Sequence, residues 1–473
     1  MYNAYITKVK NVRPHPNADR LDLVDCFGNT VCVGRDSFAE GGLAVYFPTD
    51  GQLSEEFCQV HNLVRKKDDA GNNIGGYMDP DKRNVKAINL RGEKSDGLVM
   101  PLDCLAYTGV DLATLEEGFC FTTINGKEIC CKYIPRSNRR AAAGSGNRTR
   151  KHKVPIAPLF AEHADTEQLA YNLSAFRPGD EIEITLKMHG TSGRTARLPV
   201  LKGYRRTLLD RLFRRQGTPI YEDGYVSGTR RVVLEDYEGG FYGSNEFREQ
   251  HSKMFEGKLH KGEEIFYEIV GFTTTGQPIM GDGNNEKVGK DFVKQYGKTT
   301  TFSYGCEPTG AKILGYGYDE ESPYYLEEKV PQSDIYVYRM TMTNEEGFVV
   351  EYTPDFMRYR CEQMGVKTVP VFEKFIIPNP CLRAAEGEDK EAGYLNSGEM
   401  SAGEYVKAKA EQYYDGPDPV GKTHVREGVV VRIINRPKFC AYKDKNFSFK
   451  VLEGIIKETA TAPDMEEQEE VTE

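Results

Sequence analysis

The chain has 473 residues, of which 39% are hydrophobic and 28% charged, values typical of a globular protein with two or three domains. It has no apolar run near 18 residues and no signal-peptide pattern, so we expect a cytoplasmic protein that neither spans nor binds a membrane. The formal net charge of −10 excludes an overall basic protein, and contact with nucleic acid would have to come from local patches.

Residues 1–135 contain several short segments in which polar and apolar residues alternate, separated by turns rich in Gly, Pro, Asn and Asp. This pattern predicts a small all-β barrel of the OB type. Pro14–Leu23, "PHPNADRLDL", resembles a stretch of tRNA-binding OB domains, and Leu90–Leu102 resembles a late strand of OB domains fused to RNA ligases. A turn held by prolines also explains the first stretch. The nucleic-acid interpretation assigns contacts to Arg20, Arg91 and Lys94.

Three segments differ sharply in charge from the rest of the chain. Residues 136–155 hold basic residues around a small-residue centre, "AAAGSG", and are predicted to form a flexible linker. The run from Leu201 to Arg215 mixes Arg with Leu and Phe, which fits a surface hairpin, an amphipathic helix or a phosphate contact. Residues 456–473 are predicted to be an acidic disordered tail. The 156–455 region between linker and tail is the predicted catalytic domain.

The eleven cysteines include no C-x-x-C spacing. This pattern predicts free thiols in a reducing compartment and no zinc site.

The segment "EIEITLKMHGTSGR" alternates polar and apolar residues up to a lysine and then changes to turn residues. Alternation predicts a strand with Ile182, Ile184 and Leu186 on its inner face and Lys187 at its end. A neutral lysine can attack the α-phosphorus of ATP. That reaction needs further lysines beside the phosphate, a carboxylate for a metal and a pocket for the nucleoside.

Later strand-like segments contain these groups in order. Glu268 lies in an apolar strand and could bind a ribose hydroxyl, and Glu427 precedes a Val-Val-Val strand, where it could hold hydrated Mg²⁺. Alternation places Tyr336, Tyr338 and Met340 on one face, where an aromatic ring could stack on adenine. Lys443 and Lys445 would point to one side and could hold a phosphate. Each residue also has a structural explanation, such as an ion pair, a core aromatic or a charged sheet edge.

As a set, these segments resemble motifs I, Ia, III, IIIa, IV and V of the covalent nucleotidyltransferases, which include polynucleotide ligases and mRNA capping enzymes. The segments are "KMHG", "SGTRR", "FYEIVG", "YVYRM", "EGVVVR" and "KDKNFSFK". The chain is most similar to the ATP-dependent RNA ligases with an N-terminal OB domain. The resemblance implies an α+β fold, in which an OB-type barrel precedes a nucleotidyltransferase domain of antiparallel sheets with flanking helices.

The resemblance also assigns roles by position. Lys187 would be the nucleophile that accepts AMP, and the ATP-binding set would be His189, Gly190, Arg230, Arg231, Glu268, Tyr336, Tyr338, Glu427, Lys443 and Lys445. Glu427 would hold the metal through water. Ser192 stands where DNA ligases usually carry Arg. Residues from about 352 to 421 exceed what the motifs require and are treated as an insertion.

The implied reaction is the sealing of a 3′-OH to a 5′-phosphate through lysyl-AMP, with ATP and Mg²⁺, or alternatively Mn²⁺. The implied substrate is a nicked RNA or RNA/DNA duplex with RNA on the 3′-OH side, bound by a monomer. Two alternatives stay open at this point. One is another covalent nucleotidyltransferase, a DNA ligase or an RNA-capping guanylyltransferase, and the other is a non-catalytic RNA-binding protein.

Overall fold

The computed structural model describes residues 2–68, 70–71, 73–134, 154–160, 163, 166–213, 215–230, 232–234, 237, 242, 244–314, 321–322, 327–382 and 398–459. Most of the predicted linker, residues 460–473 of the predicted tail and Arg231 lie outside these residues, whereas residues 456–459, predicted as the start of the disordered tail, belong to a helix. The chain divides into two compact units: Met1–Asn138 with Gly283–Thr300 and Lys445–Ala460, and the remainder. No helix among the described residues is both long and apolar enough to cross a lipid bilayer.

The first unit is built mainly of short antiparallel strands around one hydrophobic core. Its larger sheets have the order β11 (Leu98–Pro101), β5 (Leu43–Phe47), β1 (Ala4–Lys8), β12 (Cys120–Phe121) and the order β2 (Lys10–Pro14), β3 (Leu21–Cys26), β4 (Asn29–Gly34). Strand pairs are β9 (Ala87–Leu90) with β10 (Glu93–Asp96), β6 (Gly51–Leu53) with β15 (Cys130–Lys132), β13 (Thr123–Ile124) with β14 (Lys127–Glu128) and β7 (Lys66–Lys67) with β8 (Asn73–Gly75). The helix α1 (Glu55–Val60) begins at Ser54, whose side chain accepts a hydrogen bond from Phe57 N. Alternate residues Ala4 and Ile6 of β1 join Val45 and Phe47 of β5 in the core, because successive side chains of a strand face opposite sides.

Two later segments of the chain also belong to the first unit. The first segment contains β22 (Gly283–Asn284), α5 (Lys290–Tyr296) and β23 (Thr299–Thr300), and the second contains α8 (Phe447–Thr459). Asn89 Nδ2 of β9 donates to Val288 O at 2.5 Å, and Lys450 Nζ of α8 lies 2.6 Å from Asp96 Oδ2. These contacts tie both segments to the β9–β10 hairpin.

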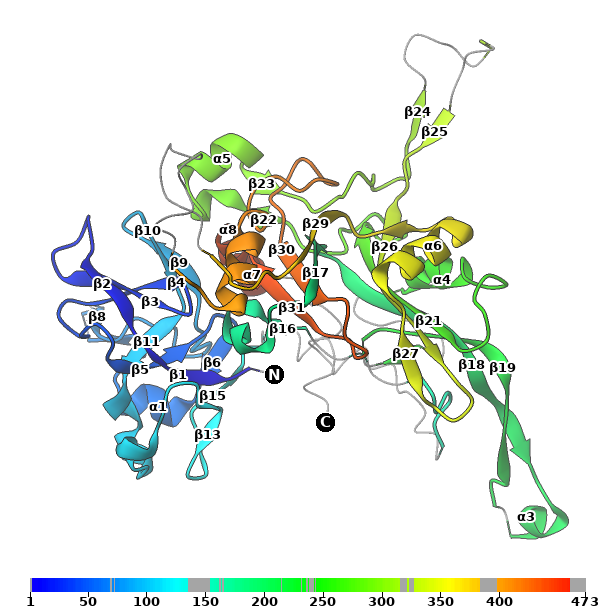
Figure 1. Ribbon diagram of the computed structural model, residues 1–473, viewed down its shortest axis with the longest axis horizontal. Coiled ribbons are helices and arrows are strands. Elements are labelled where there is room, and N and C mark those ends of the chain that lie inside the picture. Colours follow the sequence, from blue (N-terminus) through cyan, green and yellow to red (C-terminus); the bar gives the residue numbers. More distant parts are fainter. Residues whose placement is uncertain are drawn as a thin grey trace. The chain divides into compact units, whose positions relative to one another are not determined.

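The second unit contains two mainly antiparallel sheets, each with one parallel pair, that hold the candidate site (Figure 1). The first has the order β16 (Glu167–Gln168), β31 (Ala441–Lys445), β30 (Gly428–Ile433), β17 (Glu181–Lys187), β29 (Val371–Ile376). The second has the order β20 (Val233–Leu234), β19 (Thr218–Gly228), β18 (Thr191–Arg205), β21 (Glu263–Gly271), β26 (Ser333–Thr343), β27 (Val349–Glu351), with β28 (Lys367–Thr368) on β26. Also described are the hairpin of β24 (Lys312–Leu314) and β25 (Glu327–Lys329) and the helices α3 (Leu208–Leu212), α4 (Glu246–Lys253), α6 (Pro354–Met364) and α7 (Ala402–Glu411).

The described parts of residues 352–421 belong to the core of the second unit, which corrects their interpretation as an insertion. Their strand β29 pairs with β17, the strand that ends at Lys187, and Val406 and Ala410 of α7 pack in the same core as Ile182 and Ile184. Sequence reasoning missed this because β29 is an edge strand, half exposed and mixed in composition, so its local pattern is weak.

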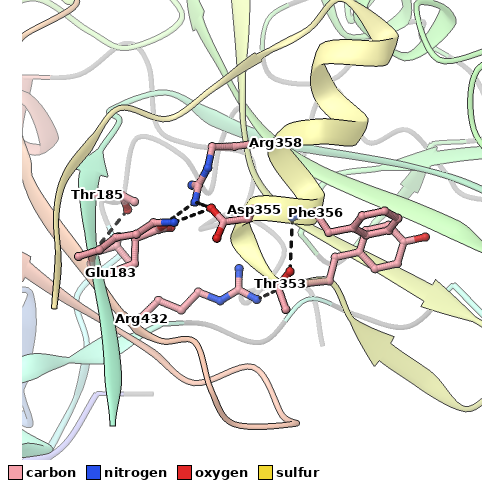
Figure 2. A network of polar contacts seen from close by, with 10 residues as sticks. Glu183, Thr185, Thr353, Asp355, Phe356, Arg358 and Arg432 are labelled. Carbon is pink, nitrogen blue, oxygen red and sulfur yellow. Dashed lines mark hydrogen bonds and ion pairs between the residues drawn. The ribbon is translucent and has the colours of Figure 1, made fainter. Parts of the chain in front are cut away.

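The polar face of β17 is also buried, and a network of charges fixes it (Figure 2). Arg358 Nη2 of α6 lies 2.7 Å from both Glu183 Oε2 and Asp355 Oδ1, and Lys374 Nζ of β29 lies 3.3 Å from Glu183 Oε2. Thr185 Oγ1 donates to Val430 O at 3.4 Å. A buried carboxylate needs such partners, since it has lost its water. The network thus holds the strand that carries Lys187 on its second face.

Candidate active site

Lys187 stands at the end of β17, as the alternation predicts. Ile182, Ile184 and Leu186 are buried, and Lys187 faces Gly428 of the neighbouring β30. Because β17 and β30 are antiparallel, the residue before β30 lies beside the end of β17. This residue is Glu427.

Glu427 contacts two polar side chains, that of Lys187 at the end of β17 and that of His189 in the turn that follows. Its Oε1 is 2.9 Å from Lys187 Nζ, and its Oε2 is 3.5 Å from His189 Nδ1. The Glu427 residue is 2% exposed, so the interaction with Lys187 is formed with little screening by water. The two distances place the proposed nucleophile and the proposed metal-holding carboxylate in direct contact.

The turn after Lys187 is held by groups from other parts of the sequence. The backbone N–H of His189 donates to Tyr304 Oη at 2.7 Å, and burial raises the pKa of Tyr304 well above its ordinary value. Arg248 of α4 donates through Nη1 to Ser192 O at 2.7 Å and through Nη2 to Thr191 Oγ1 at 2.6 Å. Neither Tyr304 nor Arg248 lies in a recognisable motif, and no local pattern could have identified them.

Gly190 lets the turn approach β21 closely. A Cβ at this position would lie 2.3 Å from Ile269 O and 2.9 Å from Glu268 Cγ, closer than atoms can approach. The register then places Ser192 opposite Glu268, and Glu268 opposite Tyr336. Paired residues of antiparallel strands point to the same face, so these three side chains share one face of the second sheet.

A β-bulge changes the predicted arrangement of the tyrosine strand. Phe266 pairs with Arg339 but the next residue, Tyr267, pairs with Val337, which leaves Tyr338 as the extra residue. Met340 therefore points into the opposite core with Ile335 and Val337, so its predicted placement beside the two tyrosines is wrong. The Tyr338 ring lies 5.8 Å from the ring of His163, which also lies 4.8 Å from Phe266.

The remaining predicted ATP-binding residues lie in different settings. Arg230 follows β19, and its carbonyl accepts a hydrogen bond from His163 N at 3.0 Å, whereas Arg231 lies outside the described residues. Lys443 pairs with Gln168 in the first sheet. Lys445 belongs to the first unit and forms an ion pair with Glu453 of α8 at 2.8 Å. The structure thus gives Lys445 a carboxylate partner that the sequence pattern did not reveal.

The three residues predicted to bind nucleic acid lie in the first unit. Asn17 Nδ2, in the turn after β2, donates to Arg91 O at 3.0 Å, and Arg35 N, just after β4, donates at 3.0 Å to the carbonyl of Arg20 in the same turn. Lys94 Nζ lies 5.4 Å from the ring centroid of Phe447 in α8. Arg20 and Arg91 are exposed, and Lys94 stacks on an aromatic ring of its own unit.

The donor set fits a hydrated divalent cation. No cluster of three or more His, Cys, Asp or Glu is found among the described residues, so a closed protein cage is not formed there. Mg²⁺ retains several waters and commonly binds through one or two carboxylates with substrate phosphates. Glu427, beside Lys187, is the carboxylate that would hold such an ion.

Comparisons with known proteins agree with this architecture. A family model described as an OB-fold domain matches residues 3–102. No curated protein matches the chain in a comparison of sequences.

Solved structures of an RNA ligase from Naegleria gruberi resemble nearly the whole chain. A mutant with ATP and Mn has 17% identity, a TM-score of 0.53 and coverage of 96% of this chain and 99% of that chain. Another mutant, with AMP and Mn, has 18% identity, a TM-score of 0.53 and coverage of 94% and 97%. The ligase with PPi has 17% identity, a TM-score of 0.52 and coverage of 94% and 97%. The chain therefore has the predicted α+β fold, with an N-terminal OB domain followed by a ligase-type nucleotidyltransferase domain.

Proposed function

We propose that this protein, which has the fold of RNA ligases with an N-terminal OB domain, is an ATP-dependent RNA ligase that joins a 3′-OH to a 5′-phosphate. The observation that carries the proposal is the contact of Lys187 Nζ with the buried Glu427 at 2.9 Å. Lys187 ends a strand whose two faces are both buried. Nucleotidyl transfer through lysine needs a carboxylate for the metal close to the nucleophile, and this pair brings the two groups together. The similarity to RNA ligase structures supports RNA as the substrate class.

In the first step, the neutral amine of Lys187 attacks the α-phosphorus of ATP. A P–N bond forms, the P–O bond to the leaving group breaks, and pyrophosphate departs to leave lysyl-AMP. Glu427 accepts a hydrogen bond from the lysine amine and orients its lone pair, while Lys443 neutralises charge on the α-phosphate. Gly190 allows the backbone of the turn to lie against the nucleotide.

Two further transfers complete the reaction. The 5′-phosphate oxygen of the RNA attacks the same phosphorus, the P–N bond breaks, and Lys187 regains its amine. The 3′-OH then attacks the 5′-phosphorus, a phosphodiester forms and AMP leaves. Glu268 binds the ribose hydroxyls and Tyr336 or Tyr338 stacks on adenine through these steps. Mg²⁺ or Mn²⁺, held through water by Glu427, would shield the phosphate charges.

The proposed substrate is a nick in an RNA or RNA/DNA duplex with ribose on the 3′-OH side. The test incubates the protein with ATP or GTP labelled at the α-phosphate and then with nicked duplexes that differ only in the sugar at the 3′-OH end. We expect a covalent label from ATP alone, with the acid lability and alkali stability of a P–N bond, and sealing only where ribose ends the 3′-OH strand. Lys187→Ala is expected to lower lysyl-AMP formation by at least about 10,000-fold, the scale on which loss of a nucleophile acts.

The other nucleotidyltransferases and a binding protein give different results in the same assay. Labelling by GTP alone indicates a capping guanylyltransferase, and equal sealing with deoxyribose at the 3′-OH end indicates a DNA ligase. A protein that binds the duplex but takes no label from either nucleotide is a non-catalytic RNA-binding protein.

A further inference from the structure

The hairpin of β18 and β19 extends well beyond the second sheet (Figure 1). β21 pairs with β18 only over Thr191–Ala196, whereas β19 pairs with β18 from Arg194 to Arg205. Beyond the sheet, the two strands continue as a ribbon that ends in α3, and we call residues 202–217 the arm tip. A strand advances about 3.3 Å per residue, so the tip lies about 45 Å along β18 from the turn that follows Lys187.

The arm tip is strongly basic in a chain whose net charge is −10. The basic residues are Lys202, Arg205, Arg206, Arg211, Arg214 and Arg215, against the single acid Asp210. The Asp210 carboxylate caps α3: its Oδ2 accepts from Thr207 N at 2.9 Å and from Thr207 Oγ1 at 2.7 Å, and these hydrogen bonds lower its pKa. The one acid is therefore already engaged within the tip. Lys202 and Arg205 place positive charge along the ribbon as well as at its end.

The arm tip also exposes large apolar side chains that a globular protein normally buries. The exposed fractions are 84% for Leu208, 64% for Leu209, 74% for Leu212 and 60% for Phe213. Leu208 and Leu212, like Leu209 and Phe213, are four residues apart, so the apolar side chains lie on one side of the helical turn. The capping box that stabilises this helical turn is formed by Thr207 and Asp210, which both belong to the tip.

We propose that the arm tip is a second contact with the duplex, more than one helical turn from the nick. The proposal rests on the proposed function, because β18 leads directly from the nucleophile turn and one duplex would touch both ends of it. The basic residues of the tip run from Lys202 on the ribbon to Arg215 beyond α3, a spread that matches phosphates spaced along a strand, whereas a bilayer or an acidic protein groove would contact the end alone. The apolar side chains then enter a groove and wedge against base steps, as Leu and Phe do in proteins that deform duplexes.

The test measures binding of RNA duplexes with one nick and arms of 6 to 24 base pairs, together with lysyl-AMP formation. A reach of about 45 Å corresponds to about 13 base pairs at the B-form rise of about 3.4 Å, and to more base pairs in A-form RNA, whose rise is smaller. For the unmodified protein, we expect Kd to fall at least 10-fold as the arm on one side passes this length.

Three variants separate the contributions of charge and apolar surface. The first replaces Arg205, Arg206, Arg211 and Arg215 by Ala, and the second replaces Leu208, Leu209, Leu212 and Phe213 by Ser. A charge-matched control replaces the exposed residues Lys253, Lys261, Lys298 and Lys329 by Ala. We expect the first two to lose the gain from longer arms and the control to keep it. The arginine variant should also lose about 0.9 in the slope of log K against log salt for each phosphate contact.

Lysyl-AMP formation and binding of the shortest duplex should stay unchanged in both tip variants, which shows that they fold. Equal affinity of all proteins for long duplexes overturns the proposal. Binding to vesicles of phosphatidylcholine and phosphatidylglycerol that only the apolar variant loses, with RNA affinity unchanged, assigns the tip to membranes and also overturns it. If the unmodified protein forms no lysyl-AMP, the proposed reaction fails, yet dependence of binding on arm length still tests the tip.

Discussion

The two ends of β18 differ in the contacts that hold them in place. Residues Thr191–Ala196 are all buried and paired with β21, Arg194–Ala196 pair with β19 as well, and Arg248 holds the start of the strand. In contrast, Lys202 and Arg205 are exposed and lie where β18 pairs only with β19. The first end follows the nucleophile and has to keep its atoms in place. The second end is determined only by hairpin pairing and a local helix cap, so its side chains are available for a partner.

The largest difference between the ends should appear when an arginine is removed from each. Arg248→Ala leaves a cavity and two buried acceptors without donors, so we expect a loss of about 3–5 kcal/mol in the free energy of unfolding. Arg205→Ala removes an exposed side chain and should change it by no more than about 0.5 kcal/mol. Urea unfolding of both variants measures the difference, and equal losses would contradict the contrast.

Acidification should lower the free energy of unfolding, because α4, the helix that carries Arg248, also carries a buried histidine. Burial lowers the pKa of His251 in α4 to about 4, and its Nε2 lies 2.9 Å from Ser333 Oγ. Between pH 6.5 and 4 the unfolded chain binds a proton that the folded chain does not. The contribution of the neutral imidazole to the free energy of unfolding is therefore complete above pH 6.5. This contribution, about 3 kcal/mol, is lost as the pH falls to 4. Urea unfolding at several pH values should show a shallower slope in His251→Gln than in the unmodified protein.

A glycine substitution at each end sharpens the comparison further. Gly190→Ala brings a Cβ against the backbone of β21, and a shift of the nucleophile of about 1 Å should slow lysyl-AMP formation about 100-fold. At Gly203 no atom lies within 4 Å of an added Cβ, so Gly203→Ala should form lysyl-AMP at the normal rate. Equal rates for the two variants would show that the turn tolerates displacement.

The smallest expected effect comes from a single hydroxyl. Tyr304→Phe removes the acceptor of the His189 N–H and leaves a buried donor unsatisfied, at a cost of about 1–3 kcal/mol. We expect lysyl-AMP formation to slow about 10-fold with little change in the affinity for long duplexes. Unfolding of Tyr304→Phe by urea serves as the control for a general loss of stability.

Much of the catalytic strand was predictable because its signals are local. The alternation in residues 181–187 predicted that Ile182, Ile184 and Leu186 are buried and that Lys187 ends the strand, and the structure confirms both. The alternation did not predict that the polar face with Glu183 and Thr185 is buried as well. In the tyrosine strand the same rule failed at Met340, because a bulge shifts the period by one residue. A bulge depends on the partner strand, and a single sequence does not reveal it.

The order of the chemical groups, the apolar face of β17 and the end of that strand at Lys187 follow from the sequence alone, since side-chain period and turn residues are properties of neighbours in the chain. Only the tertiary structure decided that Glu427 meets Lys187, that Tyr304 and Arg248 hold the turn, and that β29 of residues 352–421 completes the first sheet. It also decided that α8 and residues 283–300 join the first unit. These contacts link residues far apart in the chain, and their geometry follows from how the sheets pack as a whole.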